Sequence, residues 1–391
     1  MSSESTTVNY PEEFKGFAVS DPEEWSNPKL ISFTPKKFDD EKDSYVHIEV
    51  ETNGICGSDL FVIKNEWSHN EMTYKKGTYS PKGQIVGHEI VGRVKYASPL
   101  AQKNGYNVGD RVGVGAQCNA CLDCYECKNN KEQYCSKSNG TYNSIYPDGY
   151  VSQGGYASHV SCTTHMCFKL NDIKLESKYV SPLLCAGLTV FSPIIRGIKN
   201  ALEEKRTPKV AIIGIGGLGH LAVLLAKAKG CEVTAISRGY SKKEDATKMG
   251  ADDFIAMSDE KVDWSKYNRK FDLILNCAAS TTSLDFSKLL PSLNIYSNFV
   301  SVGIPEKTEV LKIHPVQFLR NGCGISASLL GSKDEAYELL KLADENDIKP
   351  WIEEIPICSE GVHQGVQRLS DGDVRYRFVL TDYHKFFGTG N

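Results

Sequence analysis

Five cysteines lie within eighteen residues, in the stretch CNACLDCYECKNNKEQYC that runs from Cys118 to Cys135. Four thiolates from one short loop can surround a zinc ion in tetrahedral geometry, because zinc binds cysteine sulfur at about 2.3 Å. A site with four thiolate ligands leaves no position for a substrate, so we expect this zinc to be structural. Disulfides or free buried thiols are the alternative interpretation of the same cysteines.

The spacing alone leaves the ligand set open, because one of the five cysteines is surplus. Cys121, Cys124, Cys127 and Cys135 fit the pattern Cys-x2-Cys-x2-Cys-x7-Cys and leave out Cys118. The evenly spaced run from Cys118 to Cys127 would instead leave out Cys135. In either case the chemistry of a reaction must be sought elsewhere in the chain.

A second set of metal-binding residue types is spread over three motifs. These are Cys56 in GICGSD, His88 and Glu89 in VGHEIVG, and Cys185 in PLLCAGLT. Cysteine, histidine and carboxylate side chains are zinc ligands, and a catalytic zinc keeps one displaceable ligand so that a substrate oxygen can reach the metal. Each motif is weak evidence alone, since a single cysteine before a helix is more often a core residue. Together they predict a catalytic zinc site.

A glycine-rich turn joins an apolar strand, KVAIIGIG, to an apolar helix. Gly214, Gly216 and Gly219 form the pattern G-x-G-x-x-G, with Gly217 as an additional glycine. The first glycine permits the tight turn, the second lets the backbone approach a pyrophosphate, and the third allows the helix to pack closely on the strand. A tight turn without a ligand is the alternative. The strand–turn–helix context favours a dinucleotide-binding site.

The residues at the end of the next strand indicate which dinucleotide binds. An NAD site usually has an acidic residue there to bind the ribose 2′-hydroxyl, whereas this chain has Ser237, Arg238, Lys242 and Lys243. The missing carboxylate removes repulsion toward a 2′-phosphate, and an arginine can hold a phosphate with paired donors. The alternative is that these cations only face solvent. We therefore expect NADP(H).

The motifs taken together resemble a known family. GICGSD, GHE, the cysteine loop, LLCAGLTV, GIGGLG, ISRGYSKKEDATKMGAD and DVRYRF are similar, in this order, to the zinc-dependent medium-chain alcohol dehydrogenases. The resemblance is to the cinnamyl alcohol dehydrogenase branch, especially the fungal NADP-dependent alcohol dehydrogenase VI group, and covers about residues 30 to 385. It implies a GroES-like β-barrel catalytic domain and an inserted Rossmann domain with a doubly wound parallel sheet.

The resemblance also implies roles for the metal ligands. Cys56, His88 and Cys185 would hold the catalytic zinc, and Glu89 would be the resting-state ligand that exchanges with water or substrate. Two zinc ions per chain follow from this assignment. The structural zinc would be held by the four cysteines Cys121, Cys124, Cys127 and Cys135, which leaves Cys118 free.

Other residues acquire roles by the same resemblance. Asp59 would hydrogen-bond His88, and Ser58 would exchange a proton with the substrate oxygen. Trp67 matches an aromatic residue beside the substrate pocket, with ordinary packing as the alternative. The cofactor contacts implied by the resemblance lie at Thr189, Leu218, Gly303, Ser328 and Leu330.

The chain departs from the family pattern at Phe61. The family commonly has a histidine there, five residues after the first cysteine ligand, and that histidine extends a proton relay from the cofactor ribose to solvent. A phenyl ring cannot transfer a proton, so we expect the relay to end at water or to follow another path. The segment from Lys64 to Lys82 also looks longer than usual, which puts the substrate range in question.

The pattern along the chain predicts two domains. From Tyr45 to Val114, short alternating segments bounded by glycine indicate a barrel-like β domain. From Val190 onward, helical stretches alternate with fully apolar strands, which is typical of a parallel sheet covered on both faces. We expect a catalytic domain at 1–183, with 329–391 returning to it, and a nucleotide-binding domain at 184–328.

Composition sets limits on partners and location. The 391 residues carry a net charge of −4, and 40% of them are apolar, which disfavours nucleic acid and anionic membranes as partners. The thirteen cysteines and the absence of a basic, apolar leader at the start of the sequence favour the reducing cytoplasm. By resemblance to the family we expect a homodimer that acts on a small aldehyde or alcohol.

Four other functions fit these residues less well. A polyol dehydrogenase of the same superfamily usually prefers NAD, which Arg238 opposes. Zinc-free enone or quinone reductases lack both cysteine sets. A non-catalytic NADPH-binding protein would not need intact candidate zinc ligands. A zinc-binding nucleic-acid module is opposed by the acidic charge balance. We therefore expect an enzyme that interconverts primary alcohols and aromatic (cinnamaldehyde-like) or medium-chain aldehydes, chiefly in the reducing direction.

Overall fold

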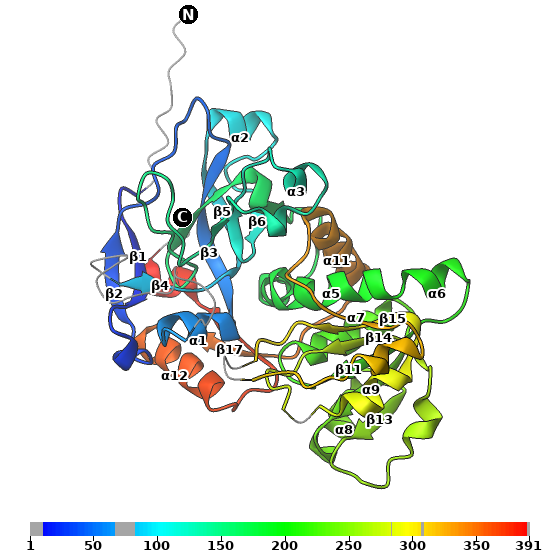
Figure 1. Cartoon of the computed structure of the whole chain (residues 1–391). Coiled ribbons are helices and arrows are strands. Elements are labelled where there is room, and N and C mark those ends of the chain that lie inside the picture. Colours follow the sequence, from blue (N-terminus) through cyan, green and yellow to red (C-terminus); the bar gives the residue numbers. More distant parts are fainter. Residues whose placement is uncertain (1–10, 67–82, 283, 306–308, 389–391) are drawn as a thin grey trace, which may run out of the picture. The chain divides into compact units, whose positions relative to one another are not determined.

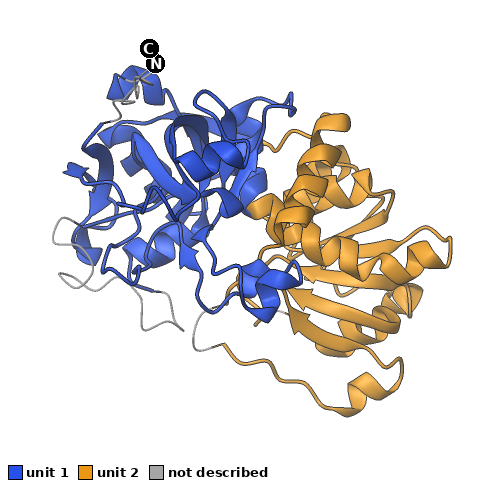
Figure 2. Ribbon diagram, turned by 90° about the horizontal axis from the view of Figure 1, so that it is seen from above, with its two compact units in different colours: residues 1–185, 352–391 blue, residues 186–351 orange. Residues whose placement is uncertain are grey.

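The computed structural model describes residues 11–66, 83–282, 284–305 and 309–388 (Figure 1). The chain divides into two compact units (Figure 2). Unit 1 consists of Met1–Cys185 together with Ile352–Asn391, and unit 2 consists of Ala186–Trp351. Both ends of the sequence thus belong to one unit, and the other unit is inserted between them.

The second boundary differs from the predicted one. We expected the chain to return to the first domain at residue 329, but unit 2 continues to Trp351. The reason is helix α11 (Lys333–Glu345), whose apolar face buries Ala336, Leu339 and Leu340 and which packs against α5 (Ala186–Gly197) of unit 2. Glu335 strengthens this packing, since its carboxylate accepts a hydrogen bond of 2.8 Å from the Ser192 hydroxyl.

Unit 1 is built mainly from antiparallel strands. A long strand, β3 (Tyr45–Ile55), pairs with β5 and β18 and also with β9. It is buried almost throughout, and neighbouring strands pair with it along both of its edges. The larger sheet has the order β10-β6-β5-β3-β18-β17, and a smaller sheet has the order β2-β1-β4. The other strands of these two sheets are β1 (Phe14–Val19), β2 (Lys29–Phe33), β4 (Gln84–Ile85), β5 (Glu89–Ala97), β6 (Arg111–Val114), β9 (His159–Thr163), β10 (Cys167–Lys169), β17 (Ile352–Pro356) and β18 (Arg377–Thr381).

The helices of unit 1 are short, apart from α12. A two-stranded ribbon, β7 (Gln117–Asn119) with β8 (Asn139–Gly140), flanks the cysteine-rich loop. The helices are α1 (Gly57–Ile63), α2 (Pro99–Lys103), α3 (Tyr125–Lys128), α4 (Ser177–Val180), α12 (Ser359–Ser370) and α13 (Tyr383–Phe387), with a 3-10 turn, η4 (Ser181–Leu184), before Cys185.

Unit 2 contains a six-stranded, fully parallel sheet with the order β13-β12-β11-β14-β15-β16. The central strands are almost entirely apolar and buried, as a sheet covered by helices on both faces requires. The strands are β11 (Lys209–Ile213), β12 (Glu232–Ser237), β13 (Asp253–Ala256), β14 (Phe271–Asn276), β15 (Leu293–Ser301) and β16 (Gly324–Ala327). The strand order reverses between β11 and β14, and such a switch point forms the usual ligand-binding crevice.

Helices α5 and α7 (Gly219–Ala228) pack against each other and against the sheet of unit 2, and α9 (Phe286–Ser292) covers β15. The other helices of this unit are α6 (Lys199–Glu203), α8 (Lys243–Lys248) and α10 (Val316–Leu319). Among the described residues, no single helix is long and apolar enough to cross a membrane, although one bent pair of helices, Ser177–Leu184 with Ala186–Gly197, passes that test by length and composition alone.

Candidate functional site

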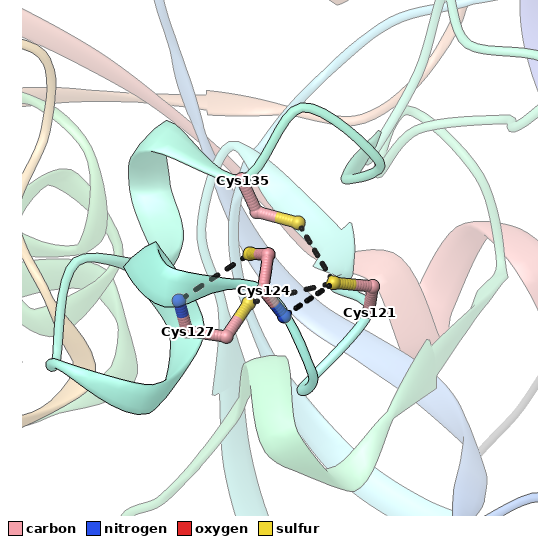
Figure 3. A group of neighbouring side chains, drawn as sticks. All are labelled: Cys121, Cys124, Cys127 and Cys135. Carbon is pink, nitrogen blue, oxygen red and sulfur yellow. Dashed lines mark hydrogen bonds between the residues drawn. The ribbon is translucent and has the colours of Figure 1, made fainter.

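Four cysteines of the loop between β7 and β8 point toward one another (Figure 3). The Sγ atom of Cys121 lies 4.0 Å from that of Cys127 and 3.5 Å from that of Cys135. Four sulfurs placed tetrahedrally at about 2.3 Å from a zinc ion would be about 3.8 Å apart. The backbone N–H groups of Asp123 and Cys124 lower the pKa of the Cys121 thiol to about 6, which favours the metal-binding thiolate. The cluster therefore fits a four-thiolate zinc site.

Cys118, the fifth cysteine of the loop, lies outside the cluster. Its Sγ atom contacts the Tyr146 hydroxyl at 3.1 Å and donates to the Gly140 carbonyl oxygen at 3.3 Å. Burial raises the pKa of its thiol to about 11, so it is a neutral core residue. Of the two ligand sets that the spacing leaves open, the folded loop brings together the one with Cys135.

A second cluster forms in unit 1 from residues that are far apart in the sequence. The candidate ligand atoms of Cys56, His88, Glu89 and Cys185 all lie within 4.8 Å of one another. Cys56 joins β3 to α1, His88 directly precedes β5, Glu89 begins that strand, and Cys185 follows η4. The Nε2 atom of His88 and the Oε2 atom of Glu89 are buried and have no hydrogen-bond partner among the described residues. Such atoms need an explanation in a native fold, and a zinc ion among these donors supplies one.

Among the described residues, the carboxylate of Glu89 is hydrogen-bonded through one of its two oxygens. Arg377, on β18, donates from Nη2 to Glu89 Oε1, and both side chains are buried, with 6% and 0% of their surface exposed. Burial raises the pKa of Glu89 to about 7, although the Arg377 charge opposes that shift. A Cβ atom on Gly54 would lie 2.0 Å from Glu89 Oε2, so only glycine leaves room for the carboxylate there.

Asp59 is buried beside this cluster, but its contacts differ from the prediction. We expected it to hydrogen-bond His88. Its carboxylate instead accepts from the backbone N–H of Cys56 at 2.9 Å, from that of Gly87 at 3.2 Å and from the Tyr156 hydroxyl at 3.0 Å. Asp59 therefore joins the two backbone segments that carry the first two ligands, rather than holding the imidazole itself.

The ring of His88 is instead stacked on Tyr142. The two ring centroids are 5.2 Å apart, and the planes are inclined by only 3°. Tyr142 is buried, and burial followed by the nearby Asp59 carboxylate raises the pKa of its phenol well above the ordinary value. Sequence reasoning assigned no role to Tyr142 or Arg377, because both reach the cluster from distant strands or loops and no local pattern marks them.

The predicted neighbours of the cluster lie on α1. Ser58 is in the first turn of this helix, two residues after Cys56, and Phe61 follows one turn later; both are half-buried. Trp67 and most of the segment from Lys64 to Lys82 lie outside the described residues.

The glycine turn of unit 2 has the geometry that its sequence predicts. Gly214 has φ of +84°, a conformation that side chains disfavour. A Cβ atom on Gly219 would lie 1.9 Å from the carbonyl oxygen of Gly214, so the helix can approach the strand only through glycine. A Cβ atom on Gly216 would meet nothing within 4 Å. That open space is where a phosphate group could approach the backbone, so the turn fits a dinucleotide.

Positive charge follows the second strand of this sheet. Ser237 ends β12, and no carboxylate occurs from there to Lys243. Arg238 is exposed and makes no ion pair within the described part of the chain, while Lys243 lies over the Tyr240 ring at 5.8 Å. An exposed arginine without a carboxylate partner is available to an anionic ligand.

The other predicted cofactor contacts also belong to unit 2. Thr189 is half-buried on α5. Gly303 lies two residues after β15, where a Cβ atom would be 2.0 Å from the Ala278 carbonyl oxygen, and Ser328 follows β16 directly. Leu330 has a positive φ of 47°. The strand-following residues of this set all lie at the carboxyl edge of the parallel sheet, where such folds bind ligands.

Comparison with known families agrees with this architecture. Residues 42–172 match the family described as "Alcohol dehydrogenase GroES-like domain", and residues 217–345 match "Zinc-binding dehydrogenase". The chain belongs to the zinc-dependent medium-chain alcohol dehydrogenases. The predicted fold, a GroES-like β domain with an inserted Rossmann-type sheet, is confirmed.

Individual relatives show how far the similarity extends. The chain is 43% identical to NADP-dependent alcohol dehydrogenase 6 of Saccharomyces cerevisiae over 381 residues, which cover 97% of this chain and 99% of the yeast protein. Among solved structures, a cinnamyl alcohol dehydrogenase from Sorghum bicolor is 29% identical with a TM-score of 0.79, covering 94% of this chain and 97% of that one. One from Helicobacter pylori, complexed with NADP(H), is 28% identical with a TM-score of 0.79, covering 94% and 98%.

Proposed function

We propose that this protein is an NADP(H)-dependent alcohol dehydrogenase that interconverts primary alcohols and aldehydes and works mainly in the direction of aldehyde reduction. The observation that carries the proposal is the buried cluster of Cys56, His88, Glu89 and Cys185, in which one nitrogen and one carboxylate oxygen have no partner in the described part of the chain. Three nitrogen or sulfur ligands and one exchangeable carboxylate are the donor set of a catalytic zinc site with an open position.

The chemistry divides between the bound groups and the chain. When bound, zinc supplies a Lewis acid that polarises an aldehyde carbonyl, and NADPH supplies the hydride. Arg377 holds the second oxygen of Glu89, so this carboxylate would remain a paired buried charge when it is not a metal ligand. Ser58 exchanges the proton with the substrate oxygen, and burial of the ligands keeps the site dry enough for charges to act strongly.

Aromatic aldehydes such as cinnamaldehyde, or medium-chain aliphatic aldehydes, are the proposed substrates. Support comes from the Sorghum and Helicobacter relatives, which are named cinnamyl alcohol dehydrogenases. Aldehyde reduction as the main direction follows from the proposed use of NADPH as hydride donor.

The preference for NADP(H) is supported by the end of β12. Arg238 is exposed without an ion-pair partner in the described part of the chain, and Lys242 and Lys243 follow it. A guanidinium group binds phosphate through two parallel hydrogen bonds, which are stronger than neutral ones. Two zinc ions per chain, one in each cluster of unit 1, are part of the same proposal.

We also propose that the enzyme is a cytoplasmic homodimer. In the described part of the chain β16 pairs only with β15, so one of its edges is available to a strand from a second copy. Large apolar side chains are exposed on β15 and before β16, among them Tyr296, Val316 and Leu319, the last 80% exposed. Light scattering of the wild type and of Leu319→Glu tests this: a dimer that dissociates in the variant supports it, and a wild-type monomer refutes it.

The deciding experiment for the enzymatic proposal is an assay of NADPH oxidation with cinnamaldehyde, benzaldehyde and hexanal. NADH replaces NADPH in a parallel series, and a third series uses protein from which a chelator has removed zinc. Turnover with NADPH, little turnover with NADH and loss of activity without zinc are the expected results. A protein that holds two zinc ions but reduces none of the three aldehydes would contradict the proposed activity.

A further inference from the structure

His220 is a fully buried residue next to the glycine turn, and none of the predicted roles uses it. It follows Gly219 in the first turn of α7, and its exposed fraction is 0%. Its Nδ1 atom lies 3.0 Å from the carbonyl oxygen of Gly217 and 3.2 Å from that of Gly216. Its Nε2 atom lies 3.3 Å from the backbone nitrogen of Trp351.

These contacts define the tautomer of the imidazole. A backbone N–H can only donate, so Nε2 must present a lone pair to Trp351. A neutral imidazole has one donor and one acceptor nitrogen, and the proton is therefore on Nδ1. Nδ1 then donates to the carbonyl oxygens of Gly217 and Gly216, and both ring nitrogens of His220 are used. The Gly216 carbonyl also accepts the backbone N–H of His220 at 2.9 Å, so the Gly217 carbonyl depends most on the imidazole.

The orientation of these two carbonyl groups determines where two N–H groups point. The Gly216 carbonyl shares a peptide plane with the N–H of Gly217, and the Gly217 carbonyl shares one with the N–H of Leu218. In a trans peptide the C=O and N–H groups point in opposite directions. Both N–H groups therefore point away from His220, and neither donates to another group in the described part of the chain.

We propose that His220 is a positioning residue for the cofactor: its imidazole holds the Gly217 carbonyl inward and shares the Gly216 carbonyl with the backbone N–H of the same residue, so that the N–H groups of Gly217 and Leu218 face the pyrophosphate of the dinucleotide. This inference rests on the proposed dinucleotide-binding function. N–H groups at a helix N-terminus are suited to phosphate oxygens, but glycine peptides rotate easily. The imidazole removes that freedom before the cofactor arrives, which lowers the entropic cost of binding.

Two substitutions separate the two hydrogen bonds of the imidazole. In His220→Asn the side-chain amide can place a donor where Nδ1 lies, but it is too short to reach Trp351. In His220→Gln the side-chain oxygen can reach the Trp351 N–H, but the donor to the glycine carbonyls is lost. Each variant thus keeps one interaction, and a general loss of packing should affect both similarly.

The experiment measures the NADPH dissociation constant of the zinc-loaded full-length enzyme by nucleotide fluorescence, with kcat, the KM for aldehyde and thermal stability measured in parallel. We expect His220→Gln to bind NADPH about tenfold more weakly, as the loss of two modest hydrogen bonds implies, and His220→Asn to stay within about threefold of the wild type. The KM for aldehyde and kcat at saturating NADPH should change little in either variant.

Several outcomes would overturn the inference. Equal NADPH affinity in the wild type and His220→Gln would overturn it. So would losses of NADPH affinity that are equal in the two variants and proportional to their losses of thermal stability. A wild type that does not bind NADPH would refute the proposed function as well, and this result is distinguishable from the others. Nitrogen NMR of the wild-type imidazole needs no variant: the Nδ1–H tautomer is expected, and an Nε2–H tautomer refutes the argument.

Discussion

Two buried histidines should make unit 1 sensitive to acid. His47 on β3 and His159 on β9 are 1% and 4% exposed, and both rings contact Phe14, with centroid distances of 5.7 and 4.8 Å. Burial, the largest cause in each case, lowers the pKa of each histidine from 6.5 to about 4. The fold therefore contains both side chains in their neutral form at neutral pH.

The sign and size of the effect follow from proton linkage. Between the folded pKa of about 4 and the unfolded pKa of 6.5, the unfolded chain binds protons that the folded chain does not, so stability falls as the pH falls. The contribution is fully present above 6.5, is lost progressively down to about 4, and changes no further below that. With about 1.4 kcal/mol per pKa unit, each histidine loses roughly 2 kcal/mol by about pH 5, or roughly 4 kcal/mol for the pair.

Urea unfolding at about pH 7.5 and about pH 5, followed by tryptophan fluorescence, measures this loss as a difference in unfolding free energy. In His159→Phe a ring remains against Phe14 but cannot titrate, so the loss between the two pH values should fall by about half, to roughly 2 kcal/mol. His314→Gln is the matched control, because His314 is exposed. Both variants retain all zinc ligands, so release of zinc by acid affects them equally. A His159→Phe protein with the pH dependence of the wild type would refute the reasoning.

Three further predictions concern the metal, the cofactor and the proton path. Cys135→Ser should lower the zinc content from about two ions to about one, whereas Cys118→Ser should keep both; metal analysis showing equal losses would contradict the assigned ligand set. Arg238→Gln should raise the KM for NADPH by about tenfold to 150-fold, since a charged hydrogen bond contributes about 1.5–3 kcal/mol, and should leave the KM for NADH almost unchanged. Phe61→His should alter the pH–rate profile of aldehyde reduction by restoring a titratable group on α1, and an identical profile would count against a relay that is truncated at this position.

The sequence allowed the cysteine loop and the glycine turn to be predicted because their functional atoms lie within a few residues of each other. A spacing of two residues between cysteines leaves a short chain few ways to direct four thiolates. The turn requires glycine at Gly214 and Gly219 for steric reasons, and these glycines can be recognised in the sequence. Cys118 lies within the same few residues as the other cysteines, so their spacing could not exclude it from the ligand set. Its removal from the set depends on Tyr146 and Gly140, which follow the cysteine loop in the sequence.

The end of the inserted unit could not be predicted in this way. The apolar periodicity of 333–345 predicts a helix, and α11 is that helix, but periodicity does not identify the surface that the apolar face will contact. That surface is α5, which begins unit 2, and the ion pair of Arg196 with Glu335 at 2.8 Å joins the same two helices. The alternation of strands and helices along the sequence does not indicate a helix–helix contact between segments more than a hundred residues apart.

The buried cluster of Cys56, His88, Glu89 and Cys185 shows the same limit at the level of single contacts. The resemblance to the family implied Asp59 as a partner of His88, but in the described part of the chain its buried carboxylate accepts from the Cys56 and Gly87 backbone. A buried carboxylate takes the donors that the local backbone offers, and an N–H group at a helix start is always in reach. The imidazole plane is then fixed by Tyr142, whose ring lies nearly parallel to it. Because stacking constrains the plane and no group in the described part of the chain is hydrogen-bonded to Nε2, the ring is oriented while this nitrogen stays available to a metal ion.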